Sequence, residues 1–472
     1  MGIKIKLTPG LDIDNPPVEL INWCSKQHRK GIKRLKNLDD YYLGEHKINK
    51  RSRKNEKCSN SKVMINQAKI TTDTVVGFVV GNPIAYSSTD GKNIEPILEA
   101  LKYMDASSHD TELKKDLSVF GEGYEILYLS ENEDEAQIKI GVLDPRSCYV
   151  ATDSTLEQNP LFAVHYTKDE CWQKGSTEYT FNVYTQTHVH TYRTQNDTHL
   201  NESDWVESTE HYFGMLPVIE YKNNKERQGD YEQAISLIDA YNQLQSDRLS
   251  DKENFVEAIL ILYGFRLAQN GEEVTGLDGD PNARANDSQM LIEAPSKSDG
   301  AEAQWLTKAF DENAVQVLAD SLISDLHKVT YVPDLSDASF GGTQTGVAMK
   351  YKLLGLLNLL ATKQRYLSQG LRKRLKLIEN MQNIRFHGSQ ASDTSTVTIL
   401  VKPNLPVNLL EIIQQIRDSQ EFLPLTTTLK WIPEIDNPQE VIDELRKQRK
   451  EDLVLNREAT NEYIESEVED DD

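Results

Sequence analysis

Apolar residues near the start of the chain recur at helical spacing. Between Leu20 and Ile48, the side chains of Ile32, Leu35 and Leu38 share one face and basic residues cover the other. This pattern predicts an amphipathic helix with a basic outer side. A second helix is predicted over Asn66–Val80, because its apolar run ends at a Gly-Asn-Pro stop signal.

The segment from Gly123 to Tyr221 changes to the pattern of strands. Short runs rich in Val, Ile, Tyr, Phe and Thr, such as GYEILYLS, AQIKIGVL and EYTFNVYT, are separated by acidic or Asp-Pro breakers. These runs predict an antiparallel meander. Together with the helices on either side, they indicate the α+β fold class.

A long helix is predicted to follow, because Tyr231–Tyr263 contains neither Gly nor Pro and would span about 50 Å. Its middle, QSDRLSDKEN, offers only Leu249 as an apolar side chain. Such a stretch cannot be buried on a wide face, so we expect it to meet solvent or a wet cavity. Two shorter helices with a break near Ser250 are the alternative.

Turn residues and acids interrupt the helical pattern from Gly264 to Gly300, with strand-like pieces at Ile261 and Met290–Ile292. We expect a small α+β insertion there. Helix resumes over Asp311–Lys328 and ends before a proline. The loop PDLSDASFGGTQTG follows, and its composition does not predict rigid structure.

The segment from Gly346 to Ile384 lacks proline, and its leucines cover more than half of a helix circumference. Such a helix needs more than one packing partner, which either its own core or neighbouring subunits could supply. Its C-terminal half is basic, which suits the negative end of a helix dipole. A strand at Val397–Val401, helices at Leu409–Phe422 and Pro438–Lys450, and an acidic tail complete the chain.

Composition narrows the class of protein. The chain has 472 residues, which suggests about two to four domains, and its 75 acidic and 52 basic residues give a net charge of -23. That balance argues against a surface built to grip nucleic acid everywhere. Basic residues gather between Lys26 and Lys69, and acidic ones between Glu451 and Asp472; a solvated surface is the simplest interpretation of each.

The four cysteines show no C-x-x-C spacing, and the N-terminus MGIKIKLTPG lacks the apolar core of a signal peptide. We therefore expect a reducing cytoplasmic compartment. The longest apolar run, Leu353–Ala361, is too short to cross a bilayer, so we expect no membrane association.

No common catalytic or metal-binding motif is complete. The chain lacks a P-loop, G-x-S-x-G and H-E-x-x-H, and the cluster of Gly341, Gly342 and Gly346 has no lysine at the position that phosphate binding requires. His188 and His190 share a strand face without a third ligand, so we expect exposed strand histidines. We expect no catalytic residue, metal or cofactor, although an active site without a local signature remains an alternative.

A candidate calcium loop also fails. Asp278 and Asp280 begin the pattern, but Ala283 stands where the turn glycine should be, and Gln289 where the bidentate glutamate should be.

Five segments resemble portal proteins of tailed bacteriophages, most closely the portal family of siphophages that infect Gram-positive hosts. The longest is NNKERQGDYEQAISLIDAYNQLQSDRLSDKENFVEAILILYG, which is similar to a portal stem helix. The others, in the expected order, are YYLGEH, GFVVGNPIAY, GEGYEILY and GVAMKYKLLGLLNLLATKQRYL. Together they are spread over most of the range 20–420, whereas the insertion after Gly264 and the last fifty residues match only loosely.

The resemblance implies a division of the chain into the parts of a portal fold. These are an α+β wing at 1–230, with a strand at 395–402 returning to it; stem helices at 231–263 and 306–331; a small α+β clip at 264–305; a tunnel loop at 332–345; a long kinked tunnel and wing helix at 346–394; a helical crown at 403–455; and a disordered acidic tail at 456–472.

The resemblance also implies a function and partners. Portal proteins form a twelve-subunit ring at one capsid vertex, through which double-stranded DNA enters during packaging and leaves during ejection. The expected partners are the terminase motor, a head-completion adaptor, and the major capsid and scaffolding proteins. The expected location is the virion, after assembly in the host cytoplasm. A different head-tail adaptor ring and a soluble α+β enzyme are the alternatives.

Two sets of site residues follow from this resemblance. In and just after the tunnel loop, we expect transient contact with the DNA backbone from Ser339, Phe340, Gln344, Thr345, Lys350 and Lys352. At the subunit interface, we expect Leu353, Leu356, Leu357, Leu360, Ile238 and Tyr241.

Overall fold

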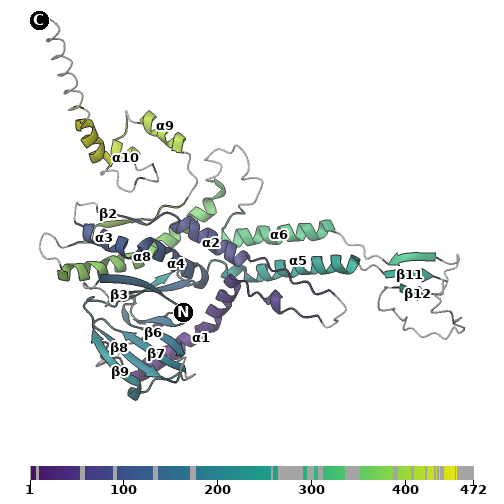
Figure 1. Ribbon diagram of the computed structural model, residues 1–472, viewed down its shortest axis with the longest axis horizontal. Coiled ribbons are helices and arrows are strands. Elements are labelled where there is room, and N and C mark those ends of the chain that lie inside the picture. Colours follow the sequence, from purple (N-terminus) through teal and green to yellow (C-terminus); the bar gives the residue numbers. More distant parts are fainter. Residues whose placement is uncertain are drawn as a thin grey trace, which may run out of the picture. The chain divides into compact units, whose positions relative to one another are not determined.

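The computed structural model describes residues 2–6, 10–53, 59–88, 93–130, 137–170, 177–256, 259–263, 291–294, 302–306, 312–334, 351–385, 392–404, 409–419, 422–429, 432, 435, 441–451 and 453. The chain divides into two compact units (Figure 1). The first unit comprises residues 1–35, 73–229 and 333–472, and the second comprises 36–72 and 230–332. Mixed helices and sheets confirm the α+β class.

Two helices run from one unit into the other. Helix α1 (Val18–Leu43) carries the apolar spacing predicted for the first helix, and Leu35 and Leu38 are buried. Helix α2 (Gln67–Val80) ends directly before the Gly-Asn-Pro stop signal.

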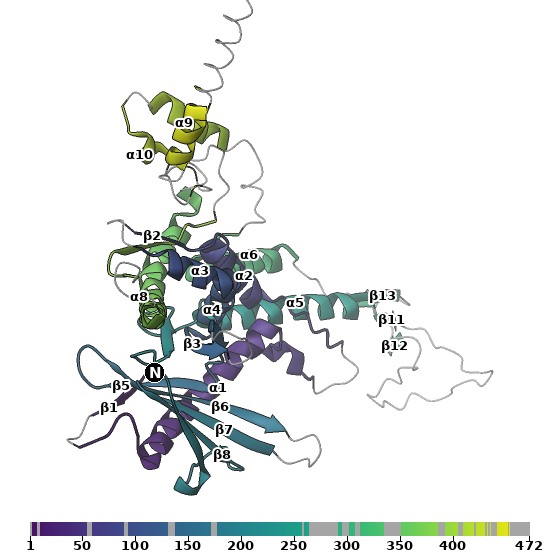
Figure 2. The ribbon, with the colours of Figure 1, turned by 60° about the vertical axis from the view of Figure 1, so that its left-hand side comes forward.

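The first unit contains a six-stranded sheet with the strand order β1-β5-β6-β7-β8-β9 (Figure 2). The N-terminal strand runs parallel to its neighbour, and the other neighbouring strands are antiparallel. The strands are β1 (Ile3–Ile5), β5 (Cys148–Asp153), β6 (Pro160–Glu170), β7 (Thr177–Tyr184), β8 (His188–Thr194) and β9 (Trp205–Glu210), the last preceded by the 3-10 turn η2 (Glu202–Asp204).

A second, three-stranded antiparallel sheet has the order β10-β3-β4. Its strands are β3 (Glu122–Ser130), β4 (Gln137–Leu143) and β10 (Val218–Lys222). The antiparallel strands predicted over Gly123–Tyr221 are confirmed, but they form two sheets rather than one meander, because only β5 to β9 follow one another in one sheet. A turn between β4 and β5, in which Asp144 accepts hydrogen bonds from the backbone and side chain of Arg146, lets the chain change sheets.

Strand alternation gives the six-stranded sheet two different buried faces. On one face, Tyr149 and Ala151 of β5 pack with Ile21 and Cys24 of α1. On the other, Cys148 and Val150 pack with residues of β3, β4 and β10. The first unit is thus layered as helix, sheet and sheet, because side chains two residues apart point to the same face. Both described cysteines, Cys24 and Cys148, are free and buried.

Helices α4 and α8 pack on the strands of the second sheet, and α3 packs on both helices. These helices are α3 (Glu95–Tyr103), α4 (Ala106–Phe120) and α8 (Leu354–Arg385). The predicted strand near Val397 is β14 (Val397–Leu400), and it pairs antiparallel with β2 (Ala85–Ser88). Two short helices, α9 (Leu409–Ser419) and α10 (Leu425–Leu429), follow, and residues 441–451 are also helical.

The second unit is built around helix α5 (Ile235–Val256), which packs against α6 (Glu312–Thr330). The short turns η1 (Lys47–Lys50) and η3 (Glu232–Ala234) also contact α5. Beyond α5, three strands form a sheet with the order β12-β11-β13: β11 (Ile259–Tyr263), β12 (Leu291–Ala294) and β13 (Glu302–Leu306).

The predicted C-terminal end of the long helix is wrong. We predicted one helix over 231–263, but α5 ends at Val256, and Ile259–Tyr263 forms β11 instead. The reason is long-range pairing, since β11 runs parallel to β12 and antiparallel to β13. Apolar runs such as ILILY suit either a helix or a strand, and distant partners decide between them. No helix within the described ranges has the length and apolar character needed to cross a membrane.

Candidate stem and channel segments

The predicted channel residues fall mostly outside the described ranges. Those that lie outside are Ser339, Phe340, Gln344, Thr345 and Lys350. Lys352 is described and exposed, and it is helical, directly before the turn at Leu353 that precedes α8. The failed calcium-loop residues near Asp278, the glycine cluster at Gly341 and the acidic tail also lie outside.

Burial within the single chain argues against four of the predicted subunit-interface residues. Leu353, Leu356 and Leu360 are buried within the single chain, with 7%, 3% and 5% of their surface exposed, and Ile238 is fully buried. These four side chains therefore offer little apolar surface to a neighbouring subunit. The buried leucines of the leucine-rich segment pack within their own chain. This is one of the two possibilities that the leucine pattern left open. Leu357 and Tyr241 are half-buried and stay predictions.

The polar middle of α5 is covered by the segment Ser59–Asn66, which we call the strap. Three α5 side chains each accept a hydrogen bond from a strap backbone N–H. Asn242 Oδ1 accepts from Ile65 at 3.0 Å, Ser246 Oγ from Val63 at 2.9 Å, and Ser250 Oγ from Ser61 at 3.1 Å. All three α5 side chains are fully buried. The expectation that this stretch meets solvent or a wet cavity is thus wrong for one of its faces.

Spacing explains why the strap and the helix match. Residues four apart on a helix share a face and lie about 6 Å apart along its axis, while alternate residues of an extended chain lie about 6.5 Å apart. The i, i+4, i+8 positions of α5 therefore face every second N–H of the strap. Polar side chains on this face are needed because a buried backbone N–H without an acceptor is costly.

The YYLGEH segment connects α1 to this series of strap–helix hydrogen bonds, which we call the zipper. The side-chain amide of Asn242 donates to His46 Nδ1 at 2.9 Å, so the imidazole proton lies on Nε2, which donates to the carbonyl of Tyr41 at 2.9 Å. The Tyr41 and His46 rings stack with centroids 4.7 Å apart. Gly44 adopts a φ of 91°, a conformation that favours glycine. Sequence reasoning singled out this segment but not its role in holding α5.

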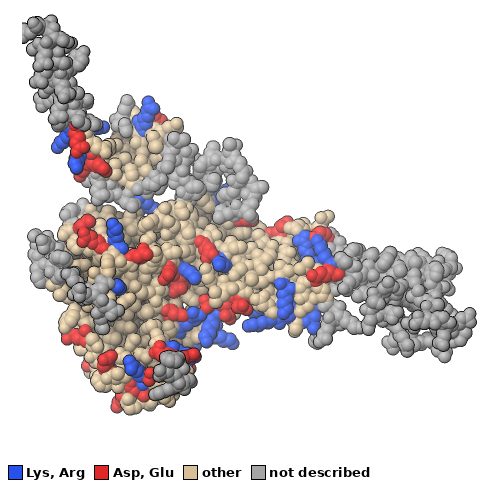
Figure 3. Space-filling view, in the orientation of Figure 1, with Lys and Arg blue, Asp and Glu red and all other residues tan. Residues whose placement is uncertain are grey.

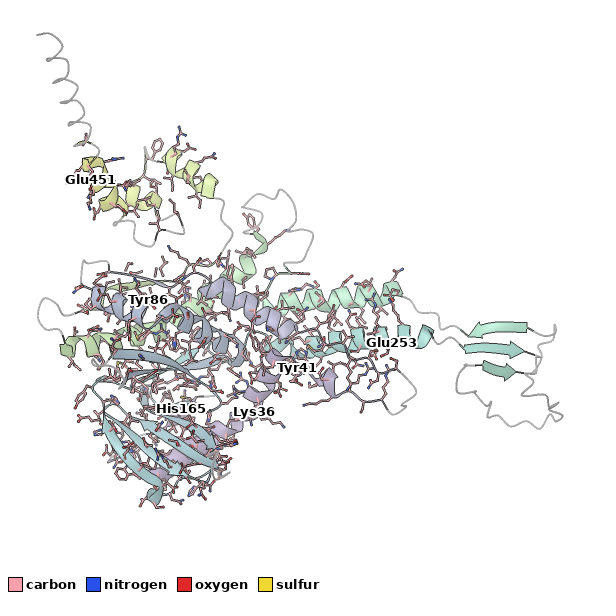
Figure 4. All side chains as sticks on the ribbon, viewed as in Figure 1. Lys36, Tyr41, Tyr86, His165, Glu253 and Glu451 are labelled. Atoms are coloured by element: carbon pink, nitrogen blue, oxygen red, sulfur yellow. The ribbon has the colours of Figure 1, made fainter. Side chains whose placement is uncertain are left out.

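Two acidic side chains of α5 hold the strap and the residues that precede it. Asp247 pairs with Arg51 and with Arg53, the latter at 3.0 Å. Partial burial would raise the pKa of Asp247, but hydrogen bonds from Gln243 and Arg51 outweigh it and lower the pKa. Nearer the far end of α5, labelled in Figure 4, Glu253 accepts hydrogen bonds from Ser59 and Ser61 of the strap.

Tyr41 and Lys47 hold the beginning of α5 in the same way. The Tyr41 hydroxyl donates to Asp239 Oδ1 at 2.6 Å, and Lys47 Nζ lies 2.7 Å from Asp239 Oδ2. Burial raises the pKa of the Tyr41 phenol, and its hydrogen bond to Asp239 raises it further. The hydroxyl therefore remains a donor.

The opposite side of α5 faces α6. Arg248 donates to Glu312 and, at 2.9 Å, to Gln316 Oε1, and Lys252 Nζ lies 3.3 Å from Glu312. The hydrogen bond from Arg248 lowers the pKa of Glu312. Arg248 and Lys252 lie about half a helical turn away from Ser246 and Ser250. Helix α5 is therefore the middle layer between the strap and α6.

A buried ion cluster holds α8 in the first unit. Arg374 is fully buried; its guanidinium contacts Glu125 of β3 and lies 2.7 Å from Asp110 Oδ1 of α4. Glu125 also accepts from His109 Nε2 at 2.8 Å and from the Tyr221 hydroxyl at 3.2 Å. The basic half of α8, which the sequence related only to the helix dipole, thus also supplies a core residue, because Arg374 is buried in this cluster.

The two carboxyl groups of this cluster differ. Burial would raise the pKa of Glu125, but the Arg374 charge and the His109 hydrogen bond outweigh it and lower the pKa to about 2. For Asp110, burial is the larger effect and raises the pKa despite Arg374. One guanidinium thus stabilises the ionised form of one buried carboxylate strongly and of the second only partly.

The histidine pair of β8 is structural. His190 is 7% exposed and His188 is half-buried, so the prediction of exposed strand histidines is wrong. Their rings stack 5.9 Å apart, and His190 Nε2 lies 2.7 Å from the carbonyl oxygen of Asp14. Among the described residues, no three His, Cys, Asp or Glu side chains are placed to hold a metal ion.

Comparison with known proteins decides the family. Residues 21–453 match the family described as Phage portal protein, SPP1 Gp6-like. The chain belongs to the phage portal protein family. It is also 22% identical to the portal protein of Bacillus phage SPP1 over 387 residues, which cover 76% of this chain and 72% of that protein. The resemblance seen in the sequence is thereby confirmed.

Family membership places this portal protein in a structural, non-enzymatic class. It implies a component of the virion capsid that assembles as a ring with other phage head proteins. The soluble-enzyme alternative loses its support, because the match extends over both compact units.

Proposed function

We propose that this portal protein forms a twelve-subunit ring at one capsid vertex. Its channel admits double-stranded DNA during packaging and releases it during ejection, and the ring is the docking platform for the terminase motor and the head-completion adaptor. Major capsid and scaffolding proteins surround it during assembly in the host cytoplasm. The observation that carries this proposal is the family match over residues 21–453. An adaptor ring is not favoured, since the match is to portal proteins.

The proposed division of the chain follows the same order as before, with one change. Residues 1–230 form the wing, to which β14 returns through its pairing with β2. Helices α5 and α6 form the stem, and the sheet of β11, β12 and β13 belongs to the clip. The clip therefore starts near Ile259 rather than at residue 264. Residues 332–345, 346–394 and 403–455 remain the tunnel loop, the tunnel and wing helix, and the crown.

The negative net charge supports passage of DNA through the channel rather than tight binding of DNA to the channel wall. Each phosphate that a wall neutralises with Lys or Arg adds salt-dependent affinity through counterion release. A chain with a net charge of -23 keeps that affinity low. Ser339, Phe340, Gln344 and Thr345, with Lys350 and Lys352 just beyond, remain the residues proposed to touch the DNA backbone transiently.

Electron microscopy of the purified protein, paired with its native mass, tests this proposal. We expect closed rings with a central hole wide enough for a DNA duplex, and a mass that is a whole multiple of the subunit mass. The matched functional test is packaging into capsids assembled with wild-type protein or with the Lys350→Ala/Lys352→Ala variant. A monomer or compact dimer without a hole would contradict the proposal. Rings that assemble into capsids but never admit DNA would contradict the channel.

A further inference from the structure

The outer sides of the stem differ in charge. On the side of α5 that carries the strap, Lys50, Lys62 and Met64 are exposed; we call this the basic face. On the other side, Val317, Leu318 and Asp320 of α6 are exposed; we call this the acidic face. Lys and Arg side chains gather along the lower edge of the stem in Figure 3, below α5.

The basic face carries lysines that form no ion pair with a carboxylate among the described residues. Lys62 Nζ donates to the carbonyl of Asn49 at 2.8 Å, which brings its ammonium group next to η1 and Lys50. Within the described part of the chain, neither Lys50 nor Lys62 pairs with a carboxylate. Lys47, Arg51 and Arg53 already satisfy the carboxylates on this side of α5. Met64, 38% exposed, adds an apolar contact beside the two lysines.

The acidic face has the complementary features. Val317 is 69% exposed and lies beside Asp320, because residues three apart on a helix share a face; Leu318 is 51% exposed on the flank of the same outer surface. Asp320 accepts a hydrogen bond from Gln316 at 2.7 Å and has no cationic partner among the described residues. Ser321 and Ser324, both small and exposed, complete the outer surface and would let a second chain approach closely.

We propose that the basic face of one subunit packs against the acidic face of the next subunit in the ring. The two faces lie on opposite sides of one three-layer unit, so the contact they make is head to tail, which is the kind of contact that builds a ring when its rotation closes. A partner of another kind would cover one face and leave the other exposed. Opposite charges beside apolar side chains also favour this contact over alignment of like faces. The inference rests on the proposed ring assembly.

Cysteine cross-linking tests the contact directly in the full chain. The double variant Lys62→Cys/Asp320→Cys, oxidised under mild conditions, is expected to give a ladder of covalent oligomers on a denaturing gel. Each single variant, Lys62→Cys or Asp320→Cys, is the matched control and should give no ladder, because like faces do not meet. The wild-type chain gives the background from its own cysteines.

Charge reversal gives a second, independent measurement. Lys62→Glu and Asp320→Lys should each shift native mass from ring to smaller species, whereas a mixture of the two variants should form rings of alternating subunits. Lys36→Glu, an exposed lysine outside both faces, should leave the ring intact. Circular dichroism confirms that each variant is folded.

The outcomes separate this inference from the proposed function. If the wild-type chain forms rings but the double-cysteine variant gives no ladder and both charge-reversed variants still form rings, the proposed contact between the two faces is wrong. The ring proposal would still stand. A wild-type chain that stays monomeric would overturn both. A ladder together with rescue by mixing would support both.

Discussion

Glu125 of β3 and Arg374 of α8 are joined by hydrogen bonds from the guanidinium to both carboxylate oxygens, and neither side chain reaches solvent. They lie 249 residues apart in the chain. This pair connects helix α8 to the three-stranded sheet, and the Tyr221 hydroxyl and His109 are the further hydrogen-bond donors to the carboxylate. The stability of the first unit should therefore depend on both partners.

Removing one partner of this pair should be strongly destabilising. Glu125→Leu leaves the Arg374 charge buried and only partly compensated, so we expect the unfolding free energy of the first unit to fall by roughly 3–5 kcal/mol. Chemical denaturation followed by near-ultraviolet circular dichroism measures this. Glu207→Leu, at an exposed position of β9, is the control and should change stability by less than about 0.5 kcal/mol. If the two variants unfold alike, the pair has no stabilising role.

The double variant Glu125→Leu/Arg374→Met should regain much of the lost stability. It removes both charges together, and the raised pKa of Asp110 lets that remaining carboxyl group become neutral at modest cost. We expect it to be more stable than either single variant. An additive loss in the double variant would show that the two side chains act independently.

Acid should weaken the contribution of Glu125 in a defined pH range. The pKa of Glu125 is lowered from 4.5 to about 2, so the carboxylate contributes stability that is fully present above pH 4.5 and is lost as pH falls towards 2. The difference in unfolding free energy between wild type and Glu125→Gln should shrink over that range. Taking this difference removes the opposite effect of Asp110, whose raised pKa favours low pH. A difference that is constant between pH 5 and 2 would contradict the assignment.

Ser246→Ala should loosen the strap. The Val63 N–H would lose its acceptor in a buried position, which costs about 1–3 kcal/mol. Hydrogen exchange at the Val63 amide should be faster than in wild type, with smaller changes at Ser61 and Ile65. Ser236→Ala is the matched control, because Ser236 is exposed on the same helix. Equal protection of Val63 in both variants would show that the Ser246 hydroxyl is dispensable.

Two glycine substitutions should have opposite effects. A Cβ added at Gly370 would lie 2.1 Å from the Tyr221 ring, so Gly370→Ala should destabilise α8 against the sheet by about 1–3 kcal/mol. A Cβ added at Gly77, inside α2, meets nothing within 4 Å, so Gly77→Ala should stabilise by about 0.5–1 kcal/mol. Thermal unfolding measures both. Gly370→Ala as stable as wild type would show that Tyr221 can move aside.

Local sequence patterns predicted those helices and strands whose positions depend on neighbouring residues alone. The start of α1, the end of α2 and the position of β14 follow from apolar spacing and stop signals. The end of α5 does not, because no Gly or Pro lies between Val256 and Ile259, and the choice of strand depends on pairing with residues more than thirty positions away.

The strap is the part of the site that the sequence did not predict. Its residues carry no helical or strand pattern of apolar positions, and its backbone is recognised by side chains at sequence separations of 177 to 189 residues. One signal was available: Asn242, Ser246 and Ser250 recur every four residues on a helix with few apolar positions. Small hydrogen-bonding side chains at this spacing suit a helix face that another backbone segment covers just as well as a face in contact with water.

The strap and α5 match closely, but not perfectly, in spacing. Each step of the zipper advances about 6 Å along the helix but about 6.5 Å along the extended chain. The two chains therefore drift apart in phase by about half an ångström per step, a mismatch that hydrogen bonds tolerate for only a few steps. At this end of the strap, the hydroxyls of Ser59 and Ser61 both donate to the long side chain of Glu253 on α5, which can reach across the accumulated offset. Helix α5 and the strap therefore stay in register over these three hydrogen bonds, and a one-residue slip of the strap would turn its donating N–H groups away from the helix.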